Sequence, residues 1–168
     1  EELGFDGIYS YEGAHYPFFP LVQAAFSTER AELATGVAIA FARNPMLCAQ
    51  IANDLQEFTK GRFILGLGVQ TQEHIERRFS QTWSKPAERM REFIRAMRAI
   101  WSCWANDGEI DFRGEFYTHT LMLPMFNPGP NPYGSPRIFL GAVGPQMLAV
   151  AGAECDGLYV TPFNTRDY

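Results

Sequence analysis

The chain alternates regularly between short, almost wholly apolar segments and longer segments with helical periodicity, and this alternation limits the folds it can adopt. Residues 33–41 and 63–68 are apolar at nearly every position, a pattern typical of strands buried on both faces of a parallel sheet. Three further strand-like segments occupy residues 6–11, 138–143 and 157–161. Strands separated by helices indicate parallel β–α–β units, so the sequence predicts one α/β domain.

Helical patterns fill the spaces between these predicted strands. A helical run covers about residues 20–28, and Asn44 followed by Pro45 is typical of the start of a helix, which Gly61 closes. Ser84 is the expected N-cap of the longest helix. One broad apolar stripe, which we interpret as core, runs along that helix at Met90, Phe93, Ile94, Met97, Ile100, Trp101 and Trp104.

The alternation is interrupted over residues 109–135. Residues 110–117 predict a small hairpin, and residues 124–136, which are rich in Pro, Gly and Asn, predict a loop. Periodicity alone leaves two arrangements open, an open doubly wound sheet or a barrel, which the order of the strands would distinguish. In both arrangements functional residues lie where strands end and the loops to the helices begin.

Charge and composition exclude several classes of function. The 14 Lys and Arg residues against 19 Asp and Glu residues give a net charge of −5, and Arg77-Arg78 is flanked by Glu73 and Glu76. Because nucleic-acid binders carry a basic patch, we expect no nucleic-acid partner.

No apolar run reaches the ~18 residues of a membrane span, so no membrane association is expected. The three cysteines form no CxxC pair, which argues against a zinc site or disulfide framework and favours the reducing cytoplasm.

Glu12 and His15 follow the first predicted strand. A carboxylate at the end of an otherwise apolar strand is a candidate general acid or base. In the alternative interpretation Glu12 pairs with an arginine, such as Arg43. His15 and His74 lack the short spacing of metal ligands, so we expect no metal.

The buried strand at residues 63–68 ends in glycines and is followed by Gln72, Glu73 and His74. Glycines at a strand end leave room for a flat ligand against the backbone. Gln72 could then hydrogen-bond the ligand, while Glu73 or His74 could move a proton. The alternative is a solvated loop that opens a helix, with Glu73 near the positive end of the helix dipole.

The segment Gly141-Ala142-Val143-Gly144-Pro145 leads from a predicted strand into a helix. A helix start offers free backbone N–H groups and the positive end of the dipole, which suits a phosphate. A plain tight turn between strand and helix would give the same pattern. The segment matches neither GxGxxG nor a Walker loop, so it gives no support for nucleotide binding by those motifs.

Taken together, several short motifs resemble a known family. In one order and at suitable spacing the chain carries Gly4-Phe5-Asp6-Gly7, Glu12, Gly36-Val37, Asn44-Pro45, Gly61-Arg62-Phe63-Ile64-Leu65-Gly66-Leu67-Gly68, Phe112-Arg113-Gly114-Glu115-Phe116-Tyr117 and Gly144-Pro145. This ordered set resembles the luciferase-like monooxygenase superfamily. The segments His74-Ile75-Glu76-Arg77-Arg78-Phe79 and Phe41-Ala42-Arg43 are similar to its actinobacterial branch of coenzyme F420-dependent oxidoreductases.

The resemblance implies a (β/α)₈ TIM barrel that binds FMN or the deazaflavin F420 at its C-terminal mouth. A complete barrel needs ~250 residues, and this chain has 168. We therefore expect a single domain over residues 1–168 that is a partial barrel, truncated at both ends, with about five parallel strands, the second to the sixth. The hairpin at residues 110–117 matches an insertion that the family carries before its fifth strand.

The resemblance also implies which residues hold the cofactor. A non-proline cis peptide behind the flavin ring falls on Gly36-Val37, with Ala38 next to it. Gly68 and Gln72 match positions near the ring system. Ala142, Val143 and Gly144 match positions near the ribityl-phosphate side of the cofactor.

The resemblance places two acids, Glu12 and Glu73, near the reaction centre. In the sugar-phosphate dehydrogenases of the family a histidine follows the first acid, but here that residue is Gly13. Either His15 or His74 is the candidate replacement. Thr161 matches a position that faces the substrate in those dehydrogenases.

The expected function is hydride transfer between coenzyme F420 and a small organic substrate, with Glu12, Glu73 and His74 as the catalytic residues and His15 and Thr161 near the substrate. Two alternatives remain open: an FMN-dependent monooxygenase of the same superfamily, and a truncated barrel that binds a ligand without activity. The resemblance further implies that the full-length parent is a homo-oligomer.

Overall fold

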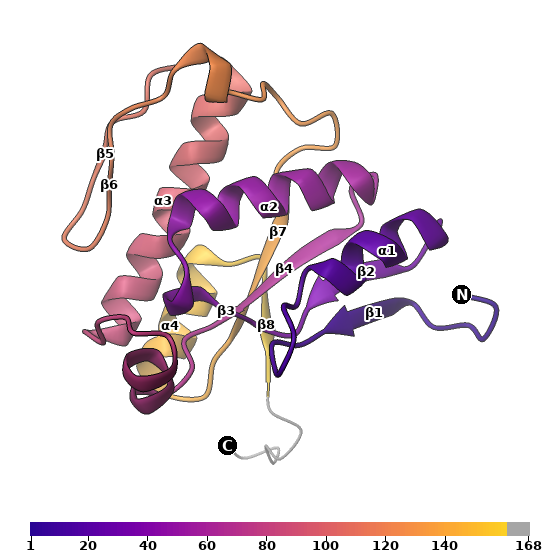
Figure 1. Ribbon diagram of the computed structural model, residues 1–168, viewed down its shortest axis with the longest axis horizontal. Helices are drawn as coiled ribbons and strands as arrows, with labels where there is room; N and C mark the ends of the chain where they lie inside the picture. Colours follow the sequence, from indigo (N-terminus) through magenta and orange to yellow (C-terminus); the bar gives the residue numbers. More distant parts are fainter. Residues whose placement is uncertain (161–168) are drawn as a thin grey trace.

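A computed structural model describes residues 1–160 and shows a curved, all-parallel sheet with α-helices packed along it (Figure 1). The strands of the sheet are β1 (Gly7–Ser10), β2 (Glu32–Thr35), β3 (Ala38–Ile39), β4 (Phe63–Gly68), β7 (Arg137–Gly141) and β8 (Gly157–Tyr159). The α-helices are α1 (Phe19–Ser27), α2 (Pro45–Phe58), α3 (Pro86–Asn106) and α4 (Pro145–Glu154). Each helix packs against the next, α1 on α2, α2 on α3 and α3 on α4.

The order of the strands resolves the choice between a barrel and an open doubly wound sheet. The strands lie in the order β1-β2-β4-β7-β8, with the short β3 paired to β4, and every pair is parallel. Successive parallel strands are therefore neighbours, without the order reversal of an open doubly wound sheet. The arrangement is that of consecutive units of a (β/α)₈ barrel, as the sequence predicts, and β1 and β8 form the two edges.

The two faces of the sheet are made of different residues. Along β4, Phe63, Leu65 and Leu67 are fully buried, and their partners in register are Leu33, Ile138 and Leu140. Because register partners on parallel strands point to the same side, these six residues share the outer face, which the helices cover. The intervening positions Ala34, Ile64, Gly66, Phe139 and Gly157 form the inner face.

The helix α2 begins as the sequence predicts. The Asn44 side chain accepts a hydrogen bond from the Leu47 N–H at 2.9 Å, and Pro45 occupies the first helical position. The predicted start of α3 at Ser84 is wrong, because the N-cap is Lys85, which makes no side-chain capping bond. Pro86 disfavours helical backbone in the residue before it, so the helix starts one residue later than predicted.

The apolar stripe of α3 is confirmed as core. Its seven members are all at most 4% exposed. The stripe packs toward α2, where the Trp101 indole N–H donates to the Ala49 carbonyl at 3.1 Å. Although α3 has 21 residues, neither it nor any other helix within residues 1–160 is apolar enough over its length to cross a bilayer.

Of the predicted strands, only 63–68 keeps its limits. The strands predicted at 6–11 and 157–161 are shorter, as β1 and β8, and two others differ more. The segment predicted as one strand over residues 33–41 is interrupted after Thr35, resumes as the two-residue β3 and ends in a 3₁₀ turn, η1 (Ala40–Ala42). An apolar run carries no signal for such a break, because the side chains of the run stay buried or nearly so on both sides of the break. The strand predicted at 138–143 ends at Gly141, so Ala142 and Val143 belong to the turn before α4.

The predicted hairpin is present alongside α3, as β5 (Phe112–Arg113) and β6 (Thr118–His119) (Figure 1). Its second strand follows Phe116-Tyr117 instead of including them. The cause is Glu92 of α3, whose carboxylate accepts hydrogen bonds from the N–H groups of residues 115, 116 and 117 at 2.6–2.9 Å. The loop after the hairpin contains a short 3₁₀ turn, η3 (Pro124–Phe126).

Candidate active site

Val37, Gly68 and Gly141 come from separate segments and meet at the C-terminal ends of β4 and β7. The Val37 side chain lies over the ends of β4 and β7, where a β-carbon on Gly68 would come within 2.6 Å of Val37 Cγ2. A β-carbon on Gly141 would lie 3.4 Å from Val37 Cγ1. We call Val37, Gly68 and Gly141 the glycine floor. Glycine at position 68 is what allows Val37 to lie this close to the strand.

Val37 reaches the floor from the break between β2 and β3. The Gly36–Val37 peptide bond is cis, as the resemblance predicts. The Gly36 N–H donates to the Ser10 carbonyl at 2.8 Å, which attaches the break to the end of β1. Ala38, the third residue predicted here, is fully buried and pairs with Leu67 of β4.

Glu12 is enclosed in a dense set of hydrogen bonds. Its Oε2 accepts from the Ile39 N–H at 2.7 Å and from Arg43 Nη1 at 2.7 Å, and its Oε1 accepts from Arg43 Nη2 at 2.9 Å. The side chains of Arg43 and Glu12 are only 7% and 6% exposed. Burial acts to lower the pKa of Arg43, but the hydrogen bonds with Glu12 and Tyr16 outweigh it and raise that pKa. The pairing with Arg43, left open by the sequence, is present.

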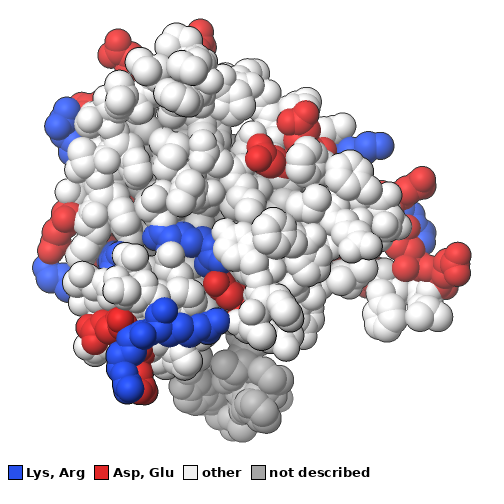
Figure 2. All heavy atoms as spheres, viewed as in Figure 1, with Lys and Arg blue, Asp and Glu red and all other residues white. Residues whose placement is uncertain are grey.

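The residues predicted after β4 lie in a solvent-exposed segment. They lead into a five-residue π-helical turn, η2 (His74–Arg78). Glu73 forms an ion pair with Arg77, and Gln72 Nε2 donates to Glu76 Oε1 at 3.0 Å. On the face seen in Figure 2, basic and acidic side chains lie next to each other, so neither charge forms a separate patch there.

A hydrogen bond joins this turn to the loop after β1. Arg78 Nη2 donates to the Gly13 carbonyl at 2.7 Å, across 65 positions of sequence. Gly13 is therefore in direct contact with the turn that begins at His74. Sequence reasoning missed this contact, although the Arg77-Arg78 pair that supplies it is visible in the sequence.

The two candidate histidines lie in different hollows. His74 lines an open hollow of about 380 Å³ together with Glu73, Arg77 and Arg78. His15 lines a separate hollow of about 360 Å³ between β1 and α1. Neither hollow is lined by both histidines.

The β7–α4 turn carries the remaining predicted cofactor residues. Ala142 is 4% exposed and Val143 46% exposed, and Gly144 is the N-cap of α4. A β-carbon on Gly144 would meet no atom within 4 Å, so the space beside this turn is open. Thr161, the predicted substrate residue, lies outside the described residues.

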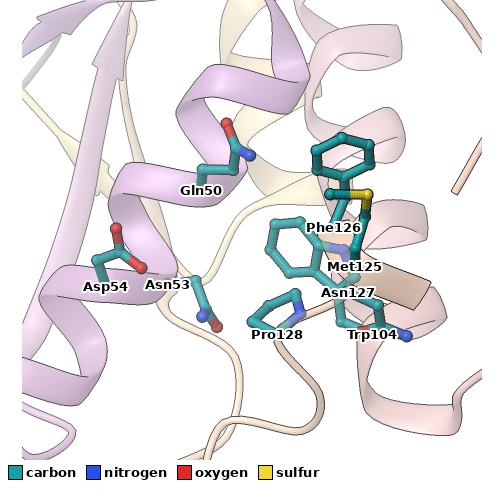
Figure 3. A pocket seen from close by; sticks show the side chains of 8 residues that line it. All are labelled: Gln50, Asn53, Asp54, Trp104, Met125, Phe126, Asn127 and Pro128. Atoms are coloured by element: carbon teal, nitrogen blue, oxygen red, sulfur yellow. The ribbon is translucent and has the colours of Figure 1, made fainter. Parts of the chain in front are cut away.

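A larger hollow lies away from all these residues. It has a volume of about 480 Å³ and is bounded by α2, the end of α3 and the η3 segment (Figure 3). Its lining comprises Gln50, Asn53, Asp54, Trp104, Met125, Phe126, Asn127 and Pro128. Because α2 and α3 cover the outer face of the sheet, this hollow belongs to the outside of the barrel and not to the mouth. Size alone therefore does not identify the candidate site.

Aromatic residues on the inner face were also missed from the sequence. A β-carbon on Gly66 would lie 2.4 Å from Tyr159 Cε2, and one on Gly157 would lie 2.4 Å from Phe139 Cζ. The alternation of glycines at 66 and 68 in β4 was the available signal, because a glycine on one strand leaves room for a large side chain from another. Within residues 1–160 no group of three or more His, Cys, Asp or Glu side chains could hold a metal ion.

Comparison with known proteins identifies the sequence family. The model of the luciferase-like monooxygenases matches residues 1–168, the whole chain. An uncharacterised protein of Mycobacterium tuberculosis is 51% identical over 100% of this chain and 49% of that protein. Another protein of Mycobacterium tuberculosis, provisionally named a coenzyme F420-dependent oxidoreductase, is 33% identical over 94% of this chain and 47% of that protein. The chain thus spans about half the length of these curated relatives.

Solved structures show the same fold. An F420-dependent secondary alcohol dehydrogenase, in complex with an F420–acetone adduct, matches with a TM-score of 0.80 and 20% identity, covering 95% of this chain and 50% of that one. A type II Baeyer–Villiger monooxygenase of Pseudomonas putida with FMN matches with a TM-score of 0.73 and 17% identity, covering 93% and 48%. At these identities the likeness concerns the fold alone.

Proposed function

The chain belongs to the luciferase-like monooxygenase family, and we propose on that premise that it forms part of an oxidoreductase that transfers hydride between coenzyme F420 and a small organic molecule. The observation that carries the proposal is the glycine floor, where Val37 lies against Gly68 and Gly141. A β-carbon at position 68 would occupy the space that Val37 fills, so the floor depends on the glycine.

The residues around the floor fit a flat ring system with an anionic side chain. The floor presents the small aliphatic side chain of Val37, which covers the buried Gly68 and borders the half-buried Gly141, and a planar ring can lie against that side chain. The open β7–α4 turn, with Gly144 at the start of α4, offers backbone N–H groups at the positive end of a ten-residue helix. In the proposed site Val37, Gly68 and Gln72 hold the ring, and Ala142, Val143 and Gly144 hold the phosphate side. Ala38, also predicted there, is fully buried and in register with Leu67 of the outer face, so its side chain does not face the ring.

The proposed proton-transfer groups are Glu73 and His74. Both are exposed side chains in the segment that follows β4, five and six residues after Gly68, and we propose that they reach the substrate from there. A carboxylate and an imidazole that remain in contact with water can exchange protons with a substrate and with solvent. A bound deazaflavin would give or accept the hydride at its C5 atom, and the chain's own residues would orient the substrate and hold the proton.

The 33% identical relative supports F420 over FMN, because its name states F420 dependence. The FMN-containing neighbour is only 17% identical and supports no choice of cofactor. An FMN monooxygenase and a ligand-binding barrel without turnover remain as outcomes of the experiment below.

The test is a fluorescence titration of F420 and of FMN onto the purified chain and, in parallel, onto the 51% identical Mycobacterium tuberculosis protein, which is about twice as long. We expect F420 to bind. The variant Gly68→Ala should weaken binding by about tenfold or more, because its methyl group displaces Val37. Gly152→Ala on α4, where a β-carbon meets nothing within 4 Å, is the matched control and should bind normally.

Tight binding of FMN with no affinity for F420 would favour the monooxygenase instead. Binding of F420 without reduction or oxidation of it by any alcohol or carbonyl substrate in a screen would favour the inactive barrel. Equal F420 affinity of Gly68→Ala and Gly152→Ala would remove the floor from the proposed site.

A further inference from the structure

The Glu12–Arg43 ion pair differs from all other ion pairs within residues 1–160. In each of the others at least one side chain is 38% exposed or more, whereas here the exposed fractions are 7% and 6%. Taking two charges out of water is costly, and the cost is offset only by close geometry and further hydrogen bonds. A pair enclosed to this degree therefore calls for a structural explanation.

The pair is connected to the segment that carries Val37. The Glu12 N–H donates to the Val37 carbonyl at 3.3 Å, and the Glu12 carboxylate accepts from the Ile39 N–H at 2.7 Å. Arg43 Nη1 donates to the Ile39 carbonyl at 2.8 Å. Glu12 thus bonds the backbone on both sides of Ala38, and both backbone groups of Ile39 are bound by the pair.

Aromatic rings hold the guanidinium in place. Its central carbon lies 4.7 Å from the ring centre of Tyr16 and 5.4 Å from that of Phe18. Arg43 Nε also donates to the Tyr16 hydroxyl at 3.4 Å. The rings and the hydrogen bonds to Ile39 leave little of either charge in contact with water, which favours one arrangement of the pair.

We propose that Glu12 and Arg43 are positioning residues, which fix the Val37–Ile39 backbone so that Val37 stays on the glycine floor, and that Glu12 carries no proton in the reaction. This inference rests on the proposed function for its effect on the cofactor, but not for its effect on the backbone. Every oxygen of the Glu12 carboxylate is already bonded to Arg43, and one is also bonded to Ile39. Proton transfer is left to the exposed Glu73 and His74.

The first measurement is amide hydrogen exchange at Ile39 in the purified chain, which needs no cofactor. In Glu12→Ala the Ile39 amide loses its acceptor, so we expect its exchange to accelerate about tenfold or more relative to the wild type. Glu154→Gln, which breaks the ion pair with Arg95 between α3 and α4, is the matched control and should leave Ile39 unchanged. Unchanged Ile39 exchange in a folded Glu12→Ala protein would overturn the proposal.

The second measurement is F420 affinity in a cycle of three variants. Glu12→Gln and Arg43→Gln each leave one buried partner without its counterpart, and each should weaken F420 binding by about tenfold. The double variant should lose no more affinity than the weaker of the two single variants, because both residues act on the same backbone segment. Losses that add up in the double variant would mean that the two residues act independently and would overturn the shared positioning role.

The pH dependence of turnover separates the two roles of Glu12. If Glu12 is a positioning residue, Glu12→Gln should leave the pH profile of kcat unchanged and raise KM for the cofactor. Loss of one limb of the pH profile in Glu12→Gln, with cofactor affinity unchanged, would show that Glu12 carries the proton after all. If the wild type binds neither F420 nor FMN, the proposed function fails, while the exchange result at Ile39 still decides the backbone role.

Discussion

The outer and inner faces of the sheet are built from alternate residues of the same strands, yet they differ in nearly every physical respect. The outer face of β4 carries Phe63, Leu65 and Leu67, all fully buried beneath the helices. The inner face of the same strand carries Ile64 and then two glycines, Gly66 and Gly68. One face fills space, and the other leaves space for side chains and, in the proposed function, for a ligand.

The difference shows how stability and function are separated within one strand. The outer face supplies apolar burial, at about 25 cal/mol per Å² of surface removed from water. The glycines of the inner face have no side chain to bury and so contribute less apolar burial. Val37, Phe139 and Tyr159 pack where β-carbons would otherwise lie. Substitutions on the two faces should therefore fail in different ways.

The largest expected effect is on the outer face. Leu65→Ala removes a side chain with no solvent exposure, and we expect it to lower the free energy of unfolding by about 2–5 kcal/mol, measured by urea denaturation. The same substitution at Leu121, which is 73% exposed, should change it by less than about 0.5 kcal/mol. Similar costs at both positions would mean that the outer face is not the principal core.

The next effect concerns addition rather than removal of atoms on the inner face. In Gly66→Ala the new methyl group would lie 1.8 Å from the Thr35 carbonyl oxygen, which is backbone and cannot rotate away. We expect a loss of about 1–3 kcal/mol in the free energy of unfolding. Gly152→Ala on α4, where the space is empty, should instead stabilise the protein by up to about 1 kcal/mol, because alanine favours helix. Thermal unfolding of both variants gives the comparison, and a neutral Gly66→Ala would contradict it.

A smaller effect should appear at high pH on the helix-covered side. Complete burial raises the pKa of the Cys48 thiol from 9.0 to about 12. Because the folded pKa is higher, the folded state retains the proton while the unfolded state releases it, so stability falls as pH rises through this range. Between pH 8 and pH 10 the wild type should lose about 1 kcal/mol more than Cys48→Ala does. Parallel pH curves for the two proteins would show that Cys48 ionises freely in the fold.

The smallest effect is expected at the inner-face ion pair of Glu32 and Arg137. The two groups lie 2.5 Å apart but are 49% and 43% exposed, so solvent screens their attraction. Glu32→Gln should cost less than about 1 kcal/mol, and urea denaturation in 1 M NaCl should reduce the difference further. A larger cost that persists in salt would indicate that this part of the inner face is dry.

Much of the fold could be predicted from local patterns. The parallel strands, the stripe of α3 and the Asn44 cap of α2 follow from apolar periodicity and from one capping residue, and all are confirmed. The predicted limits of elements were wrong where an adjacent proline or a side chain from another element decided the local structure. Pro86 moved the start of α3 away from Ser84, and Glu92 shaped the hairpin from another element.

The sequence places the candidate site at strand ends, whereas most of its contacts appear only in the structure. Parallel strands bring their C-terminal ends to one edge of the sheet, and Val37, Gly68 and Gly141 meet there. The roles predicted for Glu12, Glu73 and His74 stay predictions. Whether Glu12 is free or enclosed depends on Arg43 and Ile39, which lie 31 and 27 positions away in the sequence.

The sequence by itself determined the order of strands and helices, the residues of the helix-covered face and the family, because these depend on local periodicity and on ordered short motifs. Only the tertiary structure decided that Arg78 joins η2 to Gly13, that Arg43 encloses Glu12, and that Val37 lies on Gly68. The physical reason is that hydrogen bonds and close packing between distant segments depend on distance in space. The arrangement of the strands sets those distances, and no short sequence pattern specifies them.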